Sequence, residues 1–151
     1  MNVDMSDAPE IALLAAPALP HQPGSRTTAR PTVGALASEL RVLASQPERW
    51  WGAVRFSSGR SEKIDLEFPG SWVVVLAPGD PLGIDCDCEV MTVVAGTVTE
   101  ESVADGGGVI TALRPGGMRV HGQGQVHRIR AGGNGHAVTL HISGCGNRLP
   151  G

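Results

Sequence analysis

The length, composition and charge of the chain limit its class. Its 151 residues suit one domain, and 41% of them are hydrophobic, which is enough to build a core. The formal net charge of −3, with no basic patch, excludes nucleic acid as a partner. The chain has no apolar run of the ~18 residues that a membrane span needs, so we expect no membrane partner. Acidic residues near the start, where a secretory signal carries Lys or Arg, predict a cytoplasmic protein.

One amphipathic helix is predicted at residues 31–48, after a disordered leader at residues 1–30. The leader is rich in Ala, Pro, Thr and Ser and lacks hydrophobic periodicity. In the helix, four apolar side chains recur at helical spacing: Val33, Leu36, Leu40 and Leu43. Thr32 is placed to cap its start, and Pro47 to stop it.

From residue 49 the hydrophobic period changes to two, which predicts short strands. The expected strands are residues 51–57, 63–68, 72–77, 90–95, 97–103, 109–113, 118–121, 125–131 and 136–143. Gly and Pro separate them, and the chain contains 21 Gly and 11 Pro. The pattern indicates an all-β sandwich or barrel over residues 49–145, with a tail at 146–151, and it disfavours a parallel sheet with alternating helices.

Six short motifs then occur in an order that indicates a family. They are a strand ending in Pro-Gly at 72–79, G-I-D-C-D at 83–87, V-V-A-G-T-V at 93–98, L-R-P-G-G at 113–117, G-Q-V-H-R at 124–128 and L-H-I-S at 140–143. In this order they resemble the bacterial cysteine dioxygenase branch of the cupins, over residues 49–143. The resemblance implies a cupin-type (jelly-roll) β-barrel. It also implies a metal-dependent thiol dioxygenase, an oxidoreductase that converts a cysteine-like small thiol to the sulfinate.

The resemblance further implies a metal site, which the family builds from three histidines. His127 falls on the third histidine, whereas Asp85 and Asp87 stand in place of the H-x-H pair. Two carboxylates and one imidazole make a hard, anionic site, which favours Fe(II) or Mn(II).

Two alternatives to this site stay open. Alternation along a strand puts Asp85 and Asp87 on one face and Cys86 and Cys88 on the other, so the two cysteines with His127 form a rival set of zinc type. The second alternative is a polar loop without any metal. The chain has three cysteines and therefore no even disulfide framework.

Two more histidines have candidate roles. His141 falls on the relay histidine of the family, which implies an acid/base oriented by Thr139, while Ser143 replaces the family's tyrosine. The alternative is that His141 is a buried, hydrogen-bonded structural residue of a core strand. His121 is expected to face solvent, with the replacement of a missing metal ligand as the alternative.

The substrate-binding arginine of the family has no direct counterpart here. Gly52 stands at its position, so the resemblance implies that Arg55, or else Arg60, binds a substrate carboxylate from nearby.

Two functions follow from these observations. The first is a thiol dioxygenase-like cupin with an altered metal site. The second is a catalytically inactive or repurposed cupin that binds a small molecule or a partner in the mouth of the barrel. We expect a small-molecule ligand in either case, and the sequence leaves a homodimer open.

Overall fold

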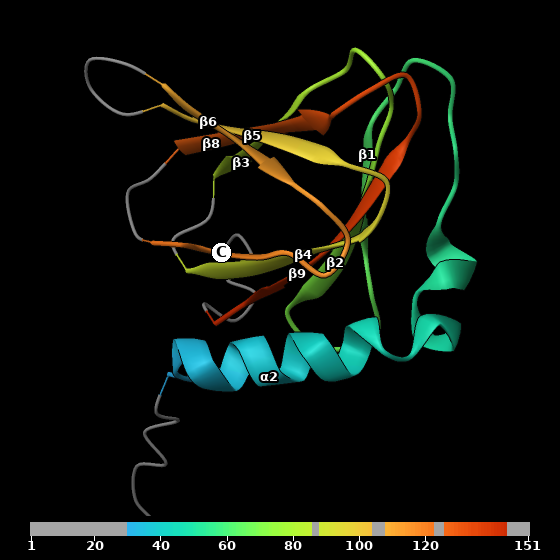
Figure 1. Ribbon diagram of the computed structural model, residues 1–151. Helices are drawn as coiled ribbons and strands as arrows, with labels where there is room; N and C mark the ends of the chain where they lie inside the picture. The colour runs from blue at the N-terminus through green and yellow to red at the C-terminus, as the bar shows by residue number, and fades with distance from the viewer. Residues whose placement is uncertain (1–29, 86–87, 104–107, 123–125, 145–151) are drawn as a thin grey trace, which may run out of the picture.

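A computed structural model gives the structure of the protein and describes residues 30–85, 88–103, 108–122 and 126–144 (Figure 1). The predicted tail and nearly all of the predicted leader lie outside these residues. So do Cys86, Asp87 and the side chain of Asp85. No helix within the described residues is long and apolar enough to cross a membrane.

Helix α2 (Val33–Ala44) is the helix that the sequence predicts. Thr32 caps it as expected, because its Oγ1 accepts a hydrogen bond from the backbone N–H of Ala35 at 3.1 Å. Its buried face consists of three leucines, Leu36, Leu40 and Leu43. Val33, the fourth apolar residue of the predicted face, is 42% exposed.

The strand predicted at residues 51–57 is wrong. The chain instead forms two short 3-10 helices, η2 (Pro47–Arg49) and η3 (Trp51–Ala53), and residues 54–57 belong to no sheet. The indole Nε1 of Trp50 donates a hydrogen bond to the carbonyl of Leu43 at 3.0 Å. This bond holds the segment against the end of α2, and Trp50 packs into the core rather than into a sheet.

Nine strands follow in the described residues: β1 (Glu62–Asp65), β2 (Ser71–Leu76), β3 (Leu82–Asp85), β4 (Glu89–Ala95), β5 (Val98–Val103), β6 (Val109–Leu113), β7 (Met118–His121), β8 (Val126–Ala131) and β9 (Ala137–Ser143). β6 and β7 have the predicted bounds, and the other predicted strands that form shift by one residue at one or both ends, except β1, which ends three residues before the predicted end at residue 68. β3 is an additional strand. Its four residues are too few to show a clear period.

The strands form two antiparallel sheets that face each other (Figure 1). One has the order β1-β2-β9-β4-β7 and the other β3-β8-β5-β6. The pairs β2/β9, β3/β8, β4/β7 and β5/β6 are nested, so that the early strands pair with the late ones. This nesting is the jelly roll, a long hairpin wrapped into two sheets, and it confirms the predicted cupin-type fold.

The first sheet is covered on both faces. Helix α2 packs on its outer face, below β4, β9 and β2 in Figure 1, against residues that include Val73, Val138 and Leu140. Its inner face meets the second sheet through residues that include Val74, Met91 and Ile129. This double coverage explains why every residue of β2 is buried, and not every second one.

Candidate metal centre

The space between the two sheets contains a group of polar side chains. They come from five strands and are each at most 5% exposed: Glu89 (β4), Glu100 (β5), His121 (β7), His127 (β8) and His141 (β9). Strand pairing brings them together because β4 lies between β7 and β9, so that Glu89 pairs with His121 and Met91 with His141. Likewise Ser102, two residues beyond Glu100 on β5, pairs with His127. Residues two apart on a strand share a face.

Glu100, His121 and His127 are close enough to share one metal ion, and we call these three residues the ligand cluster. One ligand atom of each lies within 4.8 Å of the others. His121 Nε2 is 2.6 Å and His127 Nδ1 is 2.8 Å from Glu100 Oε1. The two imidazole centroids are 3.9 Å apart. A carboxylate thus bridges two imidazoles within the barrel.

Arg119 contacts the cluster from a more exposed position. It lies two residues before His121 on β7, and its Nε donates to Glu100 Oε2 at 2.8 Å. Its side chain is 41% exposed, whereas that of Glu100 is 1% exposed. Arg119 therefore fixes the second oxygen of the buried carboxylate and presents positive charge to solvent beside it.

Glu89 and His141 form a second buried pair beside the cluster. His141 donates its Nδ1–H to Glu89 Oε1, and its Nε2 lies 2.7 Å from Thr139 Oγ1. The ring of Trp72 stacks on His141, with centroids 5.3 Å apart and an interplanar angle of 11°. On the cluster side, Glu89 Oε1 is 3.9 Å from His121 Nδ1. The contact of Thr139 with His141 agrees with the sequence prediction.

These contacts keep both carboxylates ionised. Burial by itself raises the pKa of Glu89, but the His121 and His141 imidazoles beside it outweigh burial and lower that pKa to about 2. Burial also raises the pKa of Glu100, and contacts with His121 and Arg119 overcome it and lower the value to about 2. The metal-free protein therefore carries two buried negative charges.

The two imidazoles of the cluster respond in opposite directions. Burial lowers the pKa of His121, but Glu100 and Glu89 outweigh it and raise that pKa to about 9. Burial lowers the pKa of His127, and the positive charge of His121 lowers it further. Without a metal, His121 is thus the protonated partner of the carboxylates, and His127 has a neutral ring.

The residues present fit a divalent transition metal. Two histidines and one carboxylate form the donor set that proteins use for non-haem Fe(II). Glu89 Oε2 and His121 Nδ1 are buried and make no hydrogen bond to any described residue. Because buried polar atoms are nearly always satisfied, these two atoms indicate a site in which the polar groups do not serve packing alone.

The structure places the predicted metal ligands as follows. His127 lies in the ligand cluster. The side chain of Asp85 and the whole of Asp87 lie outside the described residues, so the set Asp85, Asp87 and His127 stays a prediction, and the same holds for the rival set with Cys86. The backbone of β3 pairs with β8, and Ile84 stands opposite His127.

The expectation that His121 faces solvent is wrong. It is 1% exposed and contacts Glu100, because Arg119 and His121 both lie on the face of β7 that points toward the second sheet. The alternative role, replacement of a missing ligand, has the required geometry.

The predicted substrate-binding Arg55 is exposed and lies just beyond η3. Its Nη1 donates to the carbonyls of Gly52 and Val54 at 2.8 and 2.9 Å. Arg119, by contrast, contacts Glu100 of the ligand cluster.

Glu100 and Glu89 are not among the site residues that the sequence predicts. The available signal was the alternation of β5, in which Val98 and Glu100 share the buried face. Glu100 is followed by Glu101, however, and two adjacent acidic residues look like a solvent-facing charge run.

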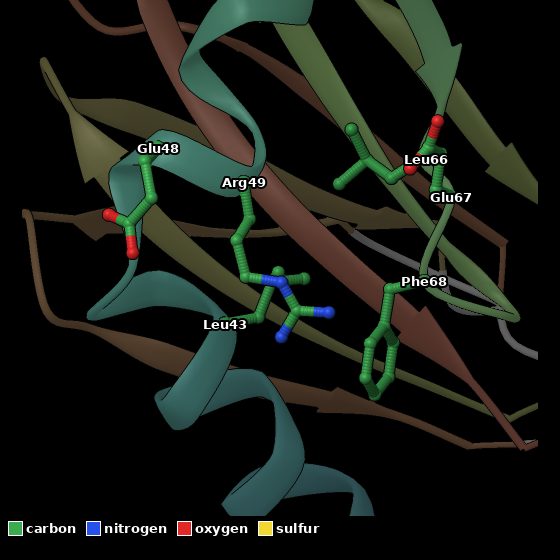
Figure 2. Close-up of a pocket in the computed structure, with 6 residues that line it drawn as sticks. All are labelled: Leu43, Glu48, Arg49, Leu66, Glu67 and Phe68. Atoms are coloured by element: carbon green, nitrogen blue, oxygen red, sulfur yellow. The ribbon is translucent and has the colours of Figure 1, made fainter.

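A hollow also lies outside the barrel, between η2 and the turn from β1 to β2 (Figure 2). Its volume is about 190 Å³, and its lining residues are Leu43, Glu48, Arg49, Leu66, Glu67 and Phe68. The Arg49 side chain reaches toward Phe68, with its guanidinium carbon 5.2 Å from the ring centroid. None of the five buried polar residues lines this hollow, so it is separate from the candidate metal centre.

No protein-family model and no curated protein matches the chain. Several solved structures have a similar fold. A hydroxypropylphosphonic acid epoxidase from S. wedmorenis has 18% identity and a TM-score of 0.43, over 48% of this chain and 42% of the epoxidase, so the match spans less than half of that protein.

Two further structures are similar over more of their own length. A conserved protein with a double-stranded β-helix domain from Klebsiella pneumoniae has 24% identity and a TM-score of 0.49, over 62% of this chain and 86% of that one. A cupin superfamily protein from Desulfitobacterium hafniense has 12% identity and a TM-score of 0.49, over 61% and 84%. The nested strand pairs establish a cupin-type jelly-roll fold for this chain, and its buried Glu100, His121 and His127 form a candidate site for a divalent metal.

Proposed function

We propose that this protein is a metal-dependent cupin that holds one divalent metal ion through Glu100, His121 and His127. The observation that carries the proposal is the convergence of these three buried side chains, whose ligand atoms lie within 4.8 Å of one another. The donors fit Fe(II) best and Mn(II) next, because they combine imidazole with carboxylate and include no thiolate.

The side chains around the cluster suit a redox metal that acts on a small molecule. A metal held by two histidines and one carboxylate supplies a redox-active centre with open coordination positions. The surrounding protein excludes bulk water, since the three ligand residues are at most 5% exposed. Arg119 holds Glu100 at 2.8 Å and directs positive charge toward solvent, where an anionic group of a substrate can pair with it.

Within this class we propose oxidation of a small cysteine-like thiol by dioxygen, on the basis of the sequence resemblance. The sulfur would take both oxygen atoms of one O2 molecule, so that the thiol becomes the sulfinic acid and dioxygen is the only oxidant required. A set with a single carboxylate is more compatible with a thiolate than a set with two. Each additional unit of like charge at about 4 Å costs roughly 4 kcal/mol at an effective dielectric constant of 20. Arg119 is better placed than Arg55 to bind the carboxylate of such a thiol, because Arg55 is bonded to the carbonyls beside it.

The test is the metal content of the purified protein and of matched variants. We expect close to one Fe or Mn per wild-type chain after anaerobic reconstitution, and loss of metal in Glu100→Gln and in His127→Ala. Glu101→Gln is the control, since it neutralises the next residue of the same strand. Full retention of metal in both cluster variants would refute the cluster as the site. Loss in the double variant Asp85→Ala/Asp87→Ala would favour the aspartate set, and loss of zinc in Cys86→Ser the cysteine set.

A second candidate is a cupin that binds a small molecule without a metal. The observation in its favour is that Glu100 already uses both oxygens, with His121 and His127 on Oε1 and Arg119 on Oε2. Such a network can persist as internal ion pairs alone. A wild-type protein that takes up no Fe, Mn or Zn during reconstitution would support this candidate over the first.

A further inference from the structure

Given the metal site proposed above, we infer that Glu89 and His141 are positioning residues that orient His121 as a metal ligand. The two residues lie next to the ligand cluster but are not members of it. Both are buried, at 1% and 0% exposed. Their role follows from the two nitrogens of the His121 ring, which face different carboxylates.

His121 directs one ring nitrogen to the cluster and the other to Glu89. Its Nε2 is 2.6 Å from Glu100 Oε1, whereas its Nδ1 is 3.9 Å from Glu89 Oε1. A histidine that ligates a metal through one nitrogen usually donates the N–H of the other to a carboxylate or a carbonyl, which fixes the ring and its tautomer. Glu89 is the carboxylate that stands at this outer nitrogen.

Two buried atoms without hydrogen bonds support the same pairing. Among the described residues, neither His121 Nδ1 nor Glu89 Oε2 has a hydrogen-bond partner. One is a nitrogen able to donate and the other belongs to an acceptor carboxylate, and the two side chains face each other across a gap slightly too long for a hydrogen bond. A small rotation of His121, as Nε2 takes a metal in place of a proton, would close the gap.

Glu89 is itself held firmly. His141 donates to its Oε1, Thr139 contacts the other nitrogen of His141, and Trp72 covers the imidazole face. Both nitrogens of His141 are therefore occupied, and its side chain is fully buried. This arrangement leaves no nitrogen for a substrate, so a positioning role replaces the acid/base role that the resemblance implies for His141.

The experiment measures Zn(II) and Co(II) affinity of the full-length protein by competition with a chromophoric chelator. We expect Glu89→Gln to bind one metal per chain, about tenfold to a hundredfold more weakly than wild type. Thr139→Val, a milder change that preserves shape, should weaken binding less. Thr92→Val is the matched control, because Thr92 is also buried and hydrogen-bonded, to the carbonyl of Gly117, but alternation along β4 puts it on the opposite face from Glu89.

A second readout separates positioning from general structural damage. In the Zn(II)-loaded protein, ¹⁵N-edited NMR of the histidine rings should show a proton on Nδ1 of His121. In Glu89→Gln the resonance of this proton should shift, and in Thr92→Val it should not.

The outcomes distinguish this inference from the proposed function. A wild-type protein that binds neither Zn(II) nor Co(II) overturns both. Wild-type binding with unchanged affinity in Glu89→Gln and Thr139→Val overturns the positioning role alone. An altered Co(II) ligand-field spectrum in Glu89→Gln, together with loss of stoichiometric binding, would make Glu89 a ligand and would also overturn it.

Discussion

The metal-free protein should lose stability as the pH rises from 7 to above 9, because His121 is protonated in the folded state. Contacts with Glu100 and Glu89 raise its pKa from 6.5 to about 9 against the opposing effect of burial. The folded protein therefore binds this proton more tightly than the unfolded chain does. The resulting stabilisation is complete below pH 6.5 and disappears as the pH passes through 9.

The magnitude follows from the same values. A pKa raised from 6.5 to about 9 corresponds to about 3 kcal/mol, at roughly 1.4 kcal/mol per unit. Most of this contribution remains at pH 7, and less than about 1 kcal/mol remains at pH 9. The lowered pKa values of Glu89 and Glu100 arise in part from the same contacts with His121. Adding them to the 3 kcal/mol would therefore count these contacts twice.

The acid side of the profile has the opposite sign. Glu89 and Glu100, lowered to about 2, contribute stability that is present above pH 4.5 and is lost as the pH falls toward 2. The lowered pKa of His127 favours unfolding as the pH drops below 6.5, because the unfolded chain then takes up a proton that the folded protein resists. Stability should therefore be highest near pH 6 to 7.

Urea unfolding with a chelator present, at intervals from pH 6 to 9.5, measures this profile. Wild type and Glu101→Gln should lose stability in parallel above pH 7. Glu100→Gln should be less stable at pH 7 and should show a shallower decline, because His121 has lost its closest carboxylate. The reasoning is refuted if the free energy of unfolding of the wild type is flat from pH 7 to 9.5, or if Glu100→Gln declines as steeply.

Three further substitutions test the fold and the site. Leu40→Ala removes a fully buried side chain between α2 and the first sheet, so urea unfolding should show a loss of about 2–5 kcal/mol; a loss below about 1 kcal/mol would mean that the helix packs loosely. Gly96→Ala should lower the midpoint of thermal unfolding, because Gly96 has φ +72° and an added Cβ would lie 2.6 Å from the carbonyl oxygen of His136; an unchanged midpoint would contradict that geometry. In the metal-loaded protein, Arg119→Met should weaken binding of a small thiol with a carboxylate by about tenfold and leave a thiol without one unaffected; equal losses in a calorimetric titration would contradict charge pairing.

Much of the fold could be predicted from the sequence because its signals are local. The leucines of α2 recur at helical spacing and Thr32 precedes them, so the helix and its cap follow from a few residues. The strands alternate and end at Gly or Pro, which predicts a sandwich or barrel. The jelly roll was implied by the resemblance of the ordered motifs to a cupin family. The strand predicted at residues 51–57 does not form, because tertiary contacts outweigh the local alternation of apolar residues. The main such contact is the hydrogen bond from Trp50 to the carbonyl of Leu43.

The candidate site could be predicted only in part because it depends on contacts between distant strands. His127 was found through the motif G-Q-V-H-R, which is contiguous. Glu100 and His121 are 21 residues apart and meet only after β5 and β7 fold into opposite sheets. The local signal for each is a charged or polar residue at a position of the strand where the alternation predicts burial. This signal predicts a buried side chain, but it does not predict which residue of another strand the side chain contacts.

The side chains between the two sheets indicate that the five buried polar residues are not needed for the stability of the fold. In β4, β8 and β9 the residues that face the opposite sheet are polar toward one end of the strand and apolar toward the other. In β4 Glu89 is followed by Met91 and Val93, and in β8 His127 is followed by Ile129 and Ala131. In β9 the order is reversed, and Ala137 precedes Thr139 and His141. The remaining inward residues show that these strands can fill the space between the sheets with aliphatic side chains. Buried ion pairs can often be replaced by apolar residues without loss of stability, and sometimes with a gain of ~1–4 kcal/mol. Five buried ionisable groups on five strands are therefore better explained by a metal that three of them hold and the other two help to position than by the fold that they occupy.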